Sequence, residues 1–303
     1  MIPQNLRDLL EKQQYRIVGN HSAVKICHWT KESMRNRGFC YKQQFYGISA
    51  HRCLQMTPAV AWCNQSCVYC WRPIEKTLGV NMDNIELDEP AEIIDGCIEA
   101  QRALLMGFKG REGVDMKLFE EAMEPNQAAI SLAGEPTLYP KLPELIEEFH
   151  KRKFTTFLVT NGTNPEMLEK IPEPTNLYIS VDSPIKAEYM KMDRPMVSGA
   201  WEALNKSLNL LKNFKCNTVV RATLMRSNMK DPETFGKFIE QFKPTYIECK
   251  AYMHVGFSKD RVKHEEMPLH EEIMQFARGI ENITDYTLID DKSASRVALL
   301  KLK

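Results

Sequence analysis

The sequence lacks the features of a membrane or secreted protein. No apolar run in its 303 residues approaches the ~18 residues that a membrane-spanning helix needs. Residues 1–16 are amphipathic and contain no apolar signal-peptide core. The nine cysteines are odd in number and unevenly placed, which argues against the disulfide framework of a secreted domain. We therefore expect a cytoplasmic protein without a membrane contact, whose cysteines serve another purpose.

The chain also lacks a net charge, because 40 basic residues balance 40 acidic ones. The balance is uneven along the sequence: the first 55 residues hold nine basic and three acidic residues, a net charge of +6. A basic segment on a neutral protein is typical of a polyanion-binding face, but equally of an ordinary solvated surface. Charge alone does not separate these two interpretations.

Internal repeats and low-complexity tracts are absent as well, so the fold has to be inferred from periodicity. From residue 56 onward, short apolar and β-branched runs alternate with amphipathic helical stretches. Strand, turn and helix recur six times, which predicts an α/β protein with parallel strands and right-handed crossovers, as a barrel or partial barrel. The six expected strands are Met56–Trp62, Ala128–Leu132, Thr155–Thr160, Leu177–Val181, Thr218–Met225 and Tyr246–Tyr252.

Helix starts and segment boundaries support this pattern. An N-cap residue followed by proline predicts a helix start at Asn164-Pro165, Ser183-Pro184 and Asp231-Pro232. In such folds ligands bind at the carboxyl ends of the strands. We predict three segments: a basic, helical and loop-rich extension (1–55), the barrel (56–255) and a C-terminal extension (256–303). The last segment is expected to hold one helix and two edge strands, Tyr286–Asp290 and Val297–Leu302.

The sharpest chemical signal is a C-x3-C-x2-C run formed by Cys63, Cys67 and Cys70. Three thiolates on one tight loop can hold three irons of a 4Fe–4S cluster and leave the fourth iron open to a small bidentate ligand. Structural zinc is the alternative, but closed zinc sites need four ligands, usually in C-x2-C pairs. The spacing resembles that of the radical S-adenosylmethionine (SAM) superfamily, whose three-cysteine loop follows the first strand of a partial (βα)6 barrel.

That resemblance implies further positions for binding SAM. Ala133-Gly134-Glu135-Pro136 is similar to the superfamily's Gly-Glu-Pro motif, whose backbone and carboxylate bind the ammonium end of the methionine, although such a tripeptide alone is usually a turn. Tyr69 matches an aromatic position that packs on the adenine. Three strand-end residues are candidate ribose or carboxylate contacts, with helix capping or turn formation as an equal alternative: Asn161, Ser180 and Asp182.

A second set of cysteines, Cys27, Cys40 and Cys53, is spaced C-x12-C-x12-C within the basic extension. Any one buried cysteine is usually inert, but three in one loop-like stretch indicate a metal site. A second three-coordinate 4Fe–4S cluster and a zinc site completed by His28 or His51 are equally compatible with the spacing. The remaining cysteines are interpreted as packing residues: Cys97, Cys216 and Cys249.

Lys42 lies two residues after Cys40. An exposed lysine is the ordinary interpretation of a single lysine in an extension of this composition. Beside a cluster and in a closed pocket, however, a lysine can form a Schiff base with a carbonyl substrate.

The region around both cysteine sets resembles the radical SAM tRNA-wyosine synthase family (4-demethylwyosine synthase). The resemblance is carried by residues 45–63 and by Cys70-Trp71-Arg72-Pro73; it is close through residues 27–73 and looser to about residue 255. That family builds the tricyclic core of wyosine from an N1-methylguanosine next to the anticodon of phenylalanine tRNA, with two carbons from pyruvate.

The resemblance implies two 4Fe–4S clusters and SAM as cofactors. The C-x3-C-x2-C cysteines would hold the SAM cluster, the other three an auxiliary cluster where pyruvate binds, and Lys42 would form the Schiff base. Cleavage of SAM would yield a radical that takes hydrogen from the guanine N1-methyl group, and the methylene radical would then add to the pyruvate carbonyl carbon. Longer relatives carry a flavodoxin domain that is not seen here, so we expect a separate flavodoxin- or ferredoxin-like electron donor, and a monomer.

If the substrate is a tRNA, the basic extension can contact its phosphates. An anticodon-loop base is already unpaired, so moving it into a pocket costs little. Expected phosphate contacts outside the extension are Arg72, Lys76, Lys259, Arg261 and Lys263. Candidate stacking faces are Trp29, Tyr41, Phe45, Tyr46 and Trp71, although packing in the core is the favoured interpretation of each. Two other functions stay open on the residues alone: a radical SAM activase or other auxiliary-cluster enzyme, and a non-catalytic, zinc-containing RNA-binding module.

Overall fold

The computed structural model describes all residues, 1–303, and their contacts divide the chain into two compact units. The first unit comprises Met1–Cys63, Asn81–Val159 and Lys170–Thr175. The second comprises Asn64–Val80, Thr160–Glu169 and Asn176–Lys303. None of the helices is long and apolar enough to span a bilayer.

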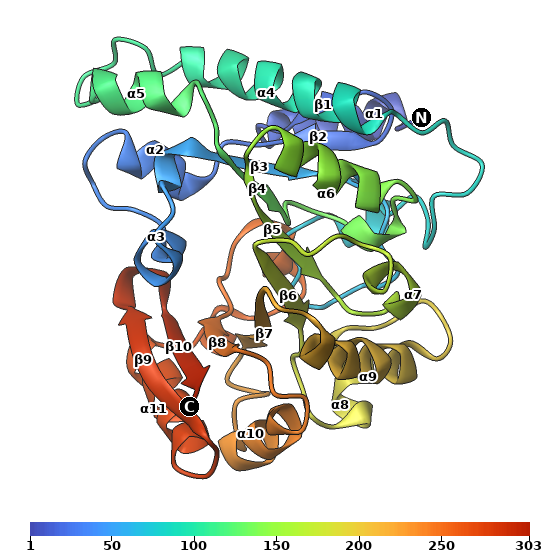
Figure 1. Cartoon of the computed structure of the whole chain (residues 1–303), viewed down its shortest axis with the longest axis vertical. Coiled ribbons are helices and arrows are strands. Elements are labelled where there is room, and N and C mark those ends of the chain that lie inside the picture. Colours follow the sequence, from blue (N-terminus) through green and yellow to red (C-terminus); the bar gives the residue numbers. More distant parts are fainter. The chain divides into compact units, whose positions relative to one another are not determined.

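The first unit is built on five strands (Figure 1). In order they are β1 (Arg16–Val18), β2 (Ser22–Val24), β3 (Cys53–Thr57), β4 (Gln127–Ile130) and β5 (Thr155–Thr160). The pairs β1–β2 and β2–β3 are antiparallel, whereas β3–β4 and β4–β5 are parallel. The helices that belong with them are α1 (Gln4–Lys12), α2 (His28–Ser33), α3 (Tyr41–Tyr46), α4 (Pro90–Met106), α5 (Met116–Ala122) and α6 (Leu142–Lys151).

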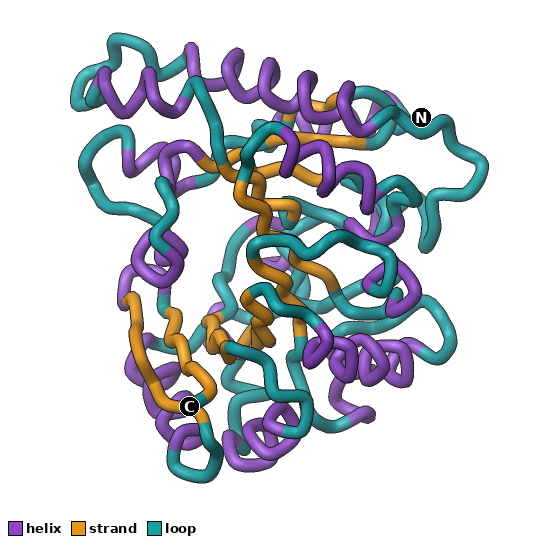
Figure 2. The backbone as a smooth tube through the Cα atoms, viewed as in Figure 1, coloured by secondary structure: helices purple, strands orange, loops and turns teal.

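The second unit continues the alternation of strand and helix, which Figure 2 shows by colour. Its strands are β6 (Asn176–Ser180), β7 (Asn217–Leu224), β8 (Tyr246–Ala251), β9 (Tyr286–Lys292) and β10 (Val297–Leu302). The pairs β6–β7 and β7–β8 are parallel, whereas β10 runs antiparallel to both β8 and β9. Its helices are α7 (Pro165–Leu168), α8 (Lys186–Met192), α9 (Ala200–Leu210), α10 (Pro232–Glu240) and α11 (His270–Glu281).

Most predicted elements are present, including the C-terminal helix and its two strands. The first predicted strand, at 56–62, is wrong in position, because β3 lies at Cys53–Thr57 and Pro58 follows it. Proline has no amide to donate to a sheet, so the apolar run after it is a buried loop. The extension is also less purely helical than predicted, since it contains the hairpin β1–β2. Three-residue strands are too short to give a clear alternating signal.

Two of the three predicted helix caps are confirmed. The side chain of Asn164 accepts the amide of Met167 at 3.3 Å, and Asp231 caps α10 in the same way. The prediction for Ser183 is wrong, because α8 begins only at Lys186. The Ser183 hydroxyl instead accepts the amide of Ile185 at 3.1 Å, which closes a local turn before the helix.

A buried cluster anchors the extension to the rest of the first unit. Ile26, directly before Cys27, and Met34, just after α2, pack with Leu105 of α4 and Phe119 of α5. Burial of an apolar side chain of this size contributes about 1.5–3 kcal/mol. The segment that carries Cys27 is therefore held by packing on both sides.

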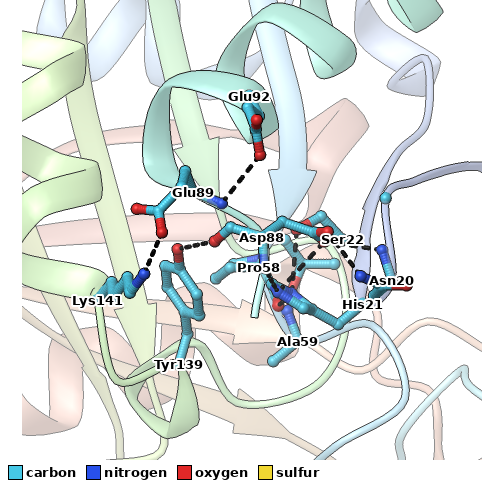
Figure 3. A network of polar contacts seen from close by, with 12 residues as sticks. Asn20, His21, Ser22, Pro58, Ala59, Asp88, Glu89, Glu92, Tyr139 and Lys141 are labelled. Carbon is cyan, nitrogen blue, oxygen red and sulfur yellow. Dashed lines mark hydrogen bonds and ion pairs between the residues drawn. The ribbon is translucent and has the colours of Figure 1, made fainter. Parts of the chain in front are cut away.

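His21 links the strand-to-loop transition after β3 to the start of α4 (Figure 3). The imidazole is fully buried; Nδ1 lies 2.6 Å from the carbonyl oxygen of Pro58, and Nε2 accepts the amide of Asp88 at 3.0 Å. This pattern defines the neutral ring with its proton on Nδ1. Tyr139 packs against the ring and donates its hydroxyl to the Asp88 carbonyl at 2.7 Å.

We expect the protein to lose stability as the pH falls below about 6.5, the ordinary value for histidine. Burial lowers the pKa of His21, so the unfolded chain takes up a proton that the folded chain resists. Stability is therefore complete above the unfolded pKa and declines below it, by at most about 1.4 kcal/mol per pH unit. Urea unfolding between pH 7.5 and 5.5 measures the slope. His21→Gln should flatten it, and an unchanged slope in that variant would show that other groups cause the decline.

Candidate functional site

The backbone of the C-x3-C-x2-C loop is fixed within the second unit by the last residue of α8 and the residue that follows it. The amides of Ser66 and Val68 donate to the carbonyl oxygens of Asp193 and Met192 at 3.1 and 2.8 Å. Because these bonds alternate with the cysteines along the loop, the last two thiols of the run are carried on a defined backbone. The holding segment is more than 120 residues away in sequence.

Arg261 clamps the same loop from the region after β8. Its guanidinium donates to the carbonyl oxygens of Val68 (3.2 Å), Cys70 and Arg72 (3.1 Å) and pairs with Glu75 at 2.8 Å. A planar fork of donors suits such a divergent set of acceptors better than an ammonium would. The side chain is only 12% exposed, so the prediction of a phosphate contact is wrong for Arg261, and also for buried Arg72.

Tyr69 lies in a buried acidic pair rather than on an open face. Its hydroxyl donates to Asp182 and contacts Asp193 at 3.0 Å, and the Cys67 thiol lies 3.5 Å from Asp193. Burial raises the pKa of Asp182, and burial with the neighbouring charge of Asp182 raises the pKa of Asp193 well above its ordinary value. Asp182 also accepts the amide of Thr223 at 2.5 Å. Sequence reasoning missed Asp193, since one aspartate at a helix end carries no signal.

The other strand-end candidates of the second unit differ in their surroundings. Asn161 donates to Asn64 of the cysteine loop at 2.8 Å and accepts the amide of Thr163 at 3.1 Å. Its side-chain amide therefore links two segments of the second unit, 160–169 and 64–80. Ser180 is the last residue of β6 and is partly buried.

The predicted Gly-Glu-Pro turn packs against the residues that precede Cys63, within the first unit. Gly134 has a φ of +71°, and a Cβ there would lie 1.8 Å from the carbonyl oxygen of Ala59, so no other residue fits. The amide of Glu135 donates to Trp62 at 2.9 Å. The Glu135 carboxylate is buried and accepts the amide of Thr137 at 3.0 Å.

The second cysteine set comes together within the first unit. Cys27 and Cys40 are the N-cap residues of α2 and α3, and Cys53 is the first residue of β3. Helix N-termini stabilise anions, which suits thiolate ligands. Burial raises the pKa of Cys27 and of Cys53, and the charge of Cys27 raises the latter further, as expected for neighbouring thiols. Partly buried Cys53 also accepts the side-chain amide of Gln127 at 3.6 Å.

Lys42 belongs to this group. Its side chain is only 8% exposed, which excludes the interpretation as a surface lysine. The ammonium nitrogen lies 4.6 Å from the ring centroid of Phe157. Burial raises the pKa of the Cys27 and Cys53 thiols, and the charge of Lys42 offsets part of that rise. A buried lysine beside three cysteines, rather than in solvent, is suited by position to supply an amine nucleophile at this site.

The structure contains no group of three His, Cys, Asp or Glu side chains placed to hold a single metal ion. His51, a proposed zinc ligand, instead bonds Glu121 at 2.7 Å. Three cysteines match the three protein ligands of a cluster with one open iron and fall one short of the four ligands of a closed zinc site. Of the cysteines predicted to pack, Cys97 and Cys249 are fully buried, whereas Cys216 is partly exposed.

Comparisons with known proteins agree with this chemistry. The family model of the radical SAM superfamily matches residues 58–239, and that of wyosine base formation matches residues 242–302. The tRNA 4-demethylwyosine synthase of Pyrococcus horikoshii is 47% identical over 99% of this chain and 89% of its own length. That of Methanocaldococcus jannaschii is 43% identical, covering 99% and 97%.

Solved structures give the same result. A structure of TYW1 with a lysine-pyruvate adduct bound superposes with a TM-score of 0.90 at 42% identity, covering 99% of this chain and 96% of that one. A crystal structure of archaeal TYW1 gives a TM-score of 0.82 at 38% identity, with the same coverage. The predicted α/β fold of the radical SAM type is thereby confirmed.

Parallel strands, the Gly-Glu-Pro turn and the three-cysteine loop define a member of the radical SAM superfamily. Within that superfamily, the full-length similarity is specific. The chain belongs to the family of S-adenosyl-L-methionine-dependent tRNA 4-demethylwyosine synthases.

Proposed function

We infer that this chain is a radical SAM enzyme that converts N1-methylguanosine next to the anticodon of phenylalanine tRNA to 4-demethylwyosine, adding two carbons from pyruvate. Its cofactors are SAM and 4Fe–4S clusters. The observation that carries the proposal is a buried lysine placed among three cysteines in a chain 47% identical to such a synthase. A relative's structure with a lysine-pyruvate adduct supports the same chemistry.

We propose that the two cysteine sets hold one cluster each. Cys63, Cys67 and Cys70 would hold the cluster that binds SAM, and Cys27, Cys40 and Cys53 the auxiliary cluster. When bound, the first supplies the electron that cleaves SAM and the second a Lewis-acid seat for the pyruvate carboxylate.

We propose that SAM is bound by the strand-end and loop residues predicted from the sequence, and contacts in the structure support several of them. Gly134 and Glu135 are fixed against the residues that lead to Cys63, so backbone acceptors are presented without reorganisation. Asn161 touches the cysteine loop. The last three proposed contacts are Tyr69, Asp182 and Ser180, of which the first two form a buried hydrogen bond.

Lys42 would act as the nucleophile toward pyruvate. Its neutral amine attacks the keto carbon, a carbon–nitrogen double bond forms, and the carbonyl oxygen leaves as water. Lys42 is only 8% exposed and lies against the ring of Phe157, so little solvent can reach the imine. The covalent bond holds the carbon that must meet the methyl group of the substrate base.

The chemistry of the reaction also bears on the electron donor, and we add proposals for the oligomeric state and the compartment. Reduction of the clusters requires an external one-electron donor, which we propose is a flavodoxin- or ferredoxin-like protein. We propose that the chain acts as a monomer, and that it works in the cytoplasm because its substrate is a tRNA.

An anaerobic labelling assay tests the function. The reconstituted protein is mixed with SAM, dithionite, carbon-labelled pyruvate and phenylalanine tRNA, with or without the N1-methyl group on the guanine. We expect label only in the methylated tRNA and one methionine released per modified base. Label in both tRNAs, or SAM-dependent turnover of a protein or small molecule without RNA, would contradict the assignment and favour the activase alternative.

A further inference from the structure

A basic cavity lies in the first unit, between the N-terminal extension and the turn that follows α4. It has a volume of about 260 Å³, and its lining includes Arg16, Lys31, Phe108 and Arg111. Ile26, the residue before Cys27, lines it as well. The cavity is therefore adjacent to the residue that precedes Cys27, the first cysteine of the second set.

Three cations surround a single aromatic ring at this cavity. Lys31 Nζ, Arg35 Cζ and Arg111 Cζ lie 5.9, 5.5 and 5.4 Å from the ring centroid of Phe108. A ring face attracts one cation by about 0.5–1 kcal/mol at a partly exposed site. This attraction does not offset the mutual repulsion of three like charges, two from the α2 segment and one from the turn after α4.

Acidic neighbours neutralise this group only in part. Lys31 donates to the neutral side chain of Gln14 at 2.9 Å, and Arg111 forms no ion pair. Arg35 has one carboxylate partner, Glu32, at 3.6 Å. Glu11 is the acidic residue in the lining itself.

Another helix end in the same unit shows how structural cations are usually paired. Arg152, at the end of α6, bonds Glu148 at 3.0 Å and also Asp95. Cations near the end of α4 could serve its dipole, but one would be enough. Unlike Arg152, Arg111 has no carboxylate partner, so ion pairing within the fold does not account for its position at Phe108.

We propose that the cavity at Phe108 binds a backbone phosphate of the tRNA substrate, an inference that rests on the proposed function. Lys31, Arg16 and Arg111 line the cavity with one ammonium and two guanidinium groups, donors that match the oxygens of a phosphodiester, and a concave site takes a single diester more readily than the flat surface of a protein. Lys31 lies one helical turn after Cys27 in α2. A phosphate held there would fix the register of the RNA relative to the helix that begins the second cysteine set.

Neutralising the cavity tests the proposal. The variant is Lys31→Gln/Arg111→Gln, and the matched control is Lys151→Gln/Lys170→Gln, which removes the same charge from exposed positions of the same unit. Binding of phenylalanine tRNA to the reconstituted enzyme is measured between 50 and 200 mM salt. We expect roughly tenfold weaker binding for the cavity variant and a salt slope lowered by about one or two units, with little change in the control.

Two further measurements keep the inference separate from the function. SAM cleavage without tRNA and an iron content of about eight atoms per chain should be unchanged in the cavity variant, which shows that both clusters are intact. Equal tRNA affinity and salt slope in both variants would overturn the phosphate site, while label transfer by the unaltered enzyme would still uphold the proposed function. Loss of reduction by a protein electron donor with unchanged tRNA affinity would also overturn it, and would assign the cavity to the acidic surface of the donor.

Discussion

Replacing Lys42 with alanine is expected to abolish pyruvate incorporation into tRNA while SAM cleavage continues. The amine is the group that would bind the keto carbon covalently, and a well-oriented covalent intermediate is worth orders of magnitude in rate. We expect product formation to fall by at least roughly 10³-fold. Mass spectrometry after borohydride treatment should show no pyruvate adduct, whereas the unaltered protein should gain one.

Lys42→Arg is the matched control for this experiment. It keeps a cation beside Phe157 and the Cys27 thiol, but a guanidinium does not form an imine under these conditions. Both variants should therefore fail to trap pyruvate, and the arginine variant should keep the iron of the second cluster. Trapping that persists in either variant would remove Lys42 from the mechanism.

Replacing Cys67 with alanine should abolish SAM cleavage altogether. Without the second thiolate of the run, the first cluster loses one of its three protein ligands and its seat for SAM. We expect bound iron to drop from about eight to about four atoms per chain, since the second set of cysteines is unchanged. Pyruvate trapping on Lys42 should survive, which separates the two halves of the chemistry.

Cys216→Ala provides the comparison, because this cysteine is partly exposed and belongs to neither set. It should retain full iron content and SAM cleavage. If the Cys67 variant still produced methionine and 5′-deoxyadenosine at the normal rate, the assignment of the SAM cluster would be wrong. Loss of all iron from that variant would instead show that the two cysteine sets do not load independently.

The candidate site could be predicted from sequence wherever its chemistry depends on local spacing. The cysteine run, the Gly-Glu-Pro turn and Lys42 next to Cys40 all lie within a few residues of each other or of a strand end. Five of the six barrel strands were predicted for the same reason, since periodicity is a local property.

The rest depends on contacts between distant residues, which a single sequence does not report. Asp193 meets Tyr69 over 124 positions, and Arg261 reaches Val68 over 193. Composition made Arg261 look like a phosphate contact, because a lone arginine gives no sign of being buried. The basic extension was recognised, but not that Arg111 from another segment joins Lys31 around one ring.

The hydrogen bonds of Arg261 join the two segments of the chain that the family models match. Arg261 lies in the wyosine-specific part, residues 242–302, yet it binds the loop of the generic radical SAM part, residues 58–239. The wyosine-specific segment thus also stabilises the cysteine loop that all radical SAM enzymes share. A hybrid enzyme joined near residue 240 would inherit the cysteines but not their brace, so substrate choice and cluster support in this fold have to be exchanged together.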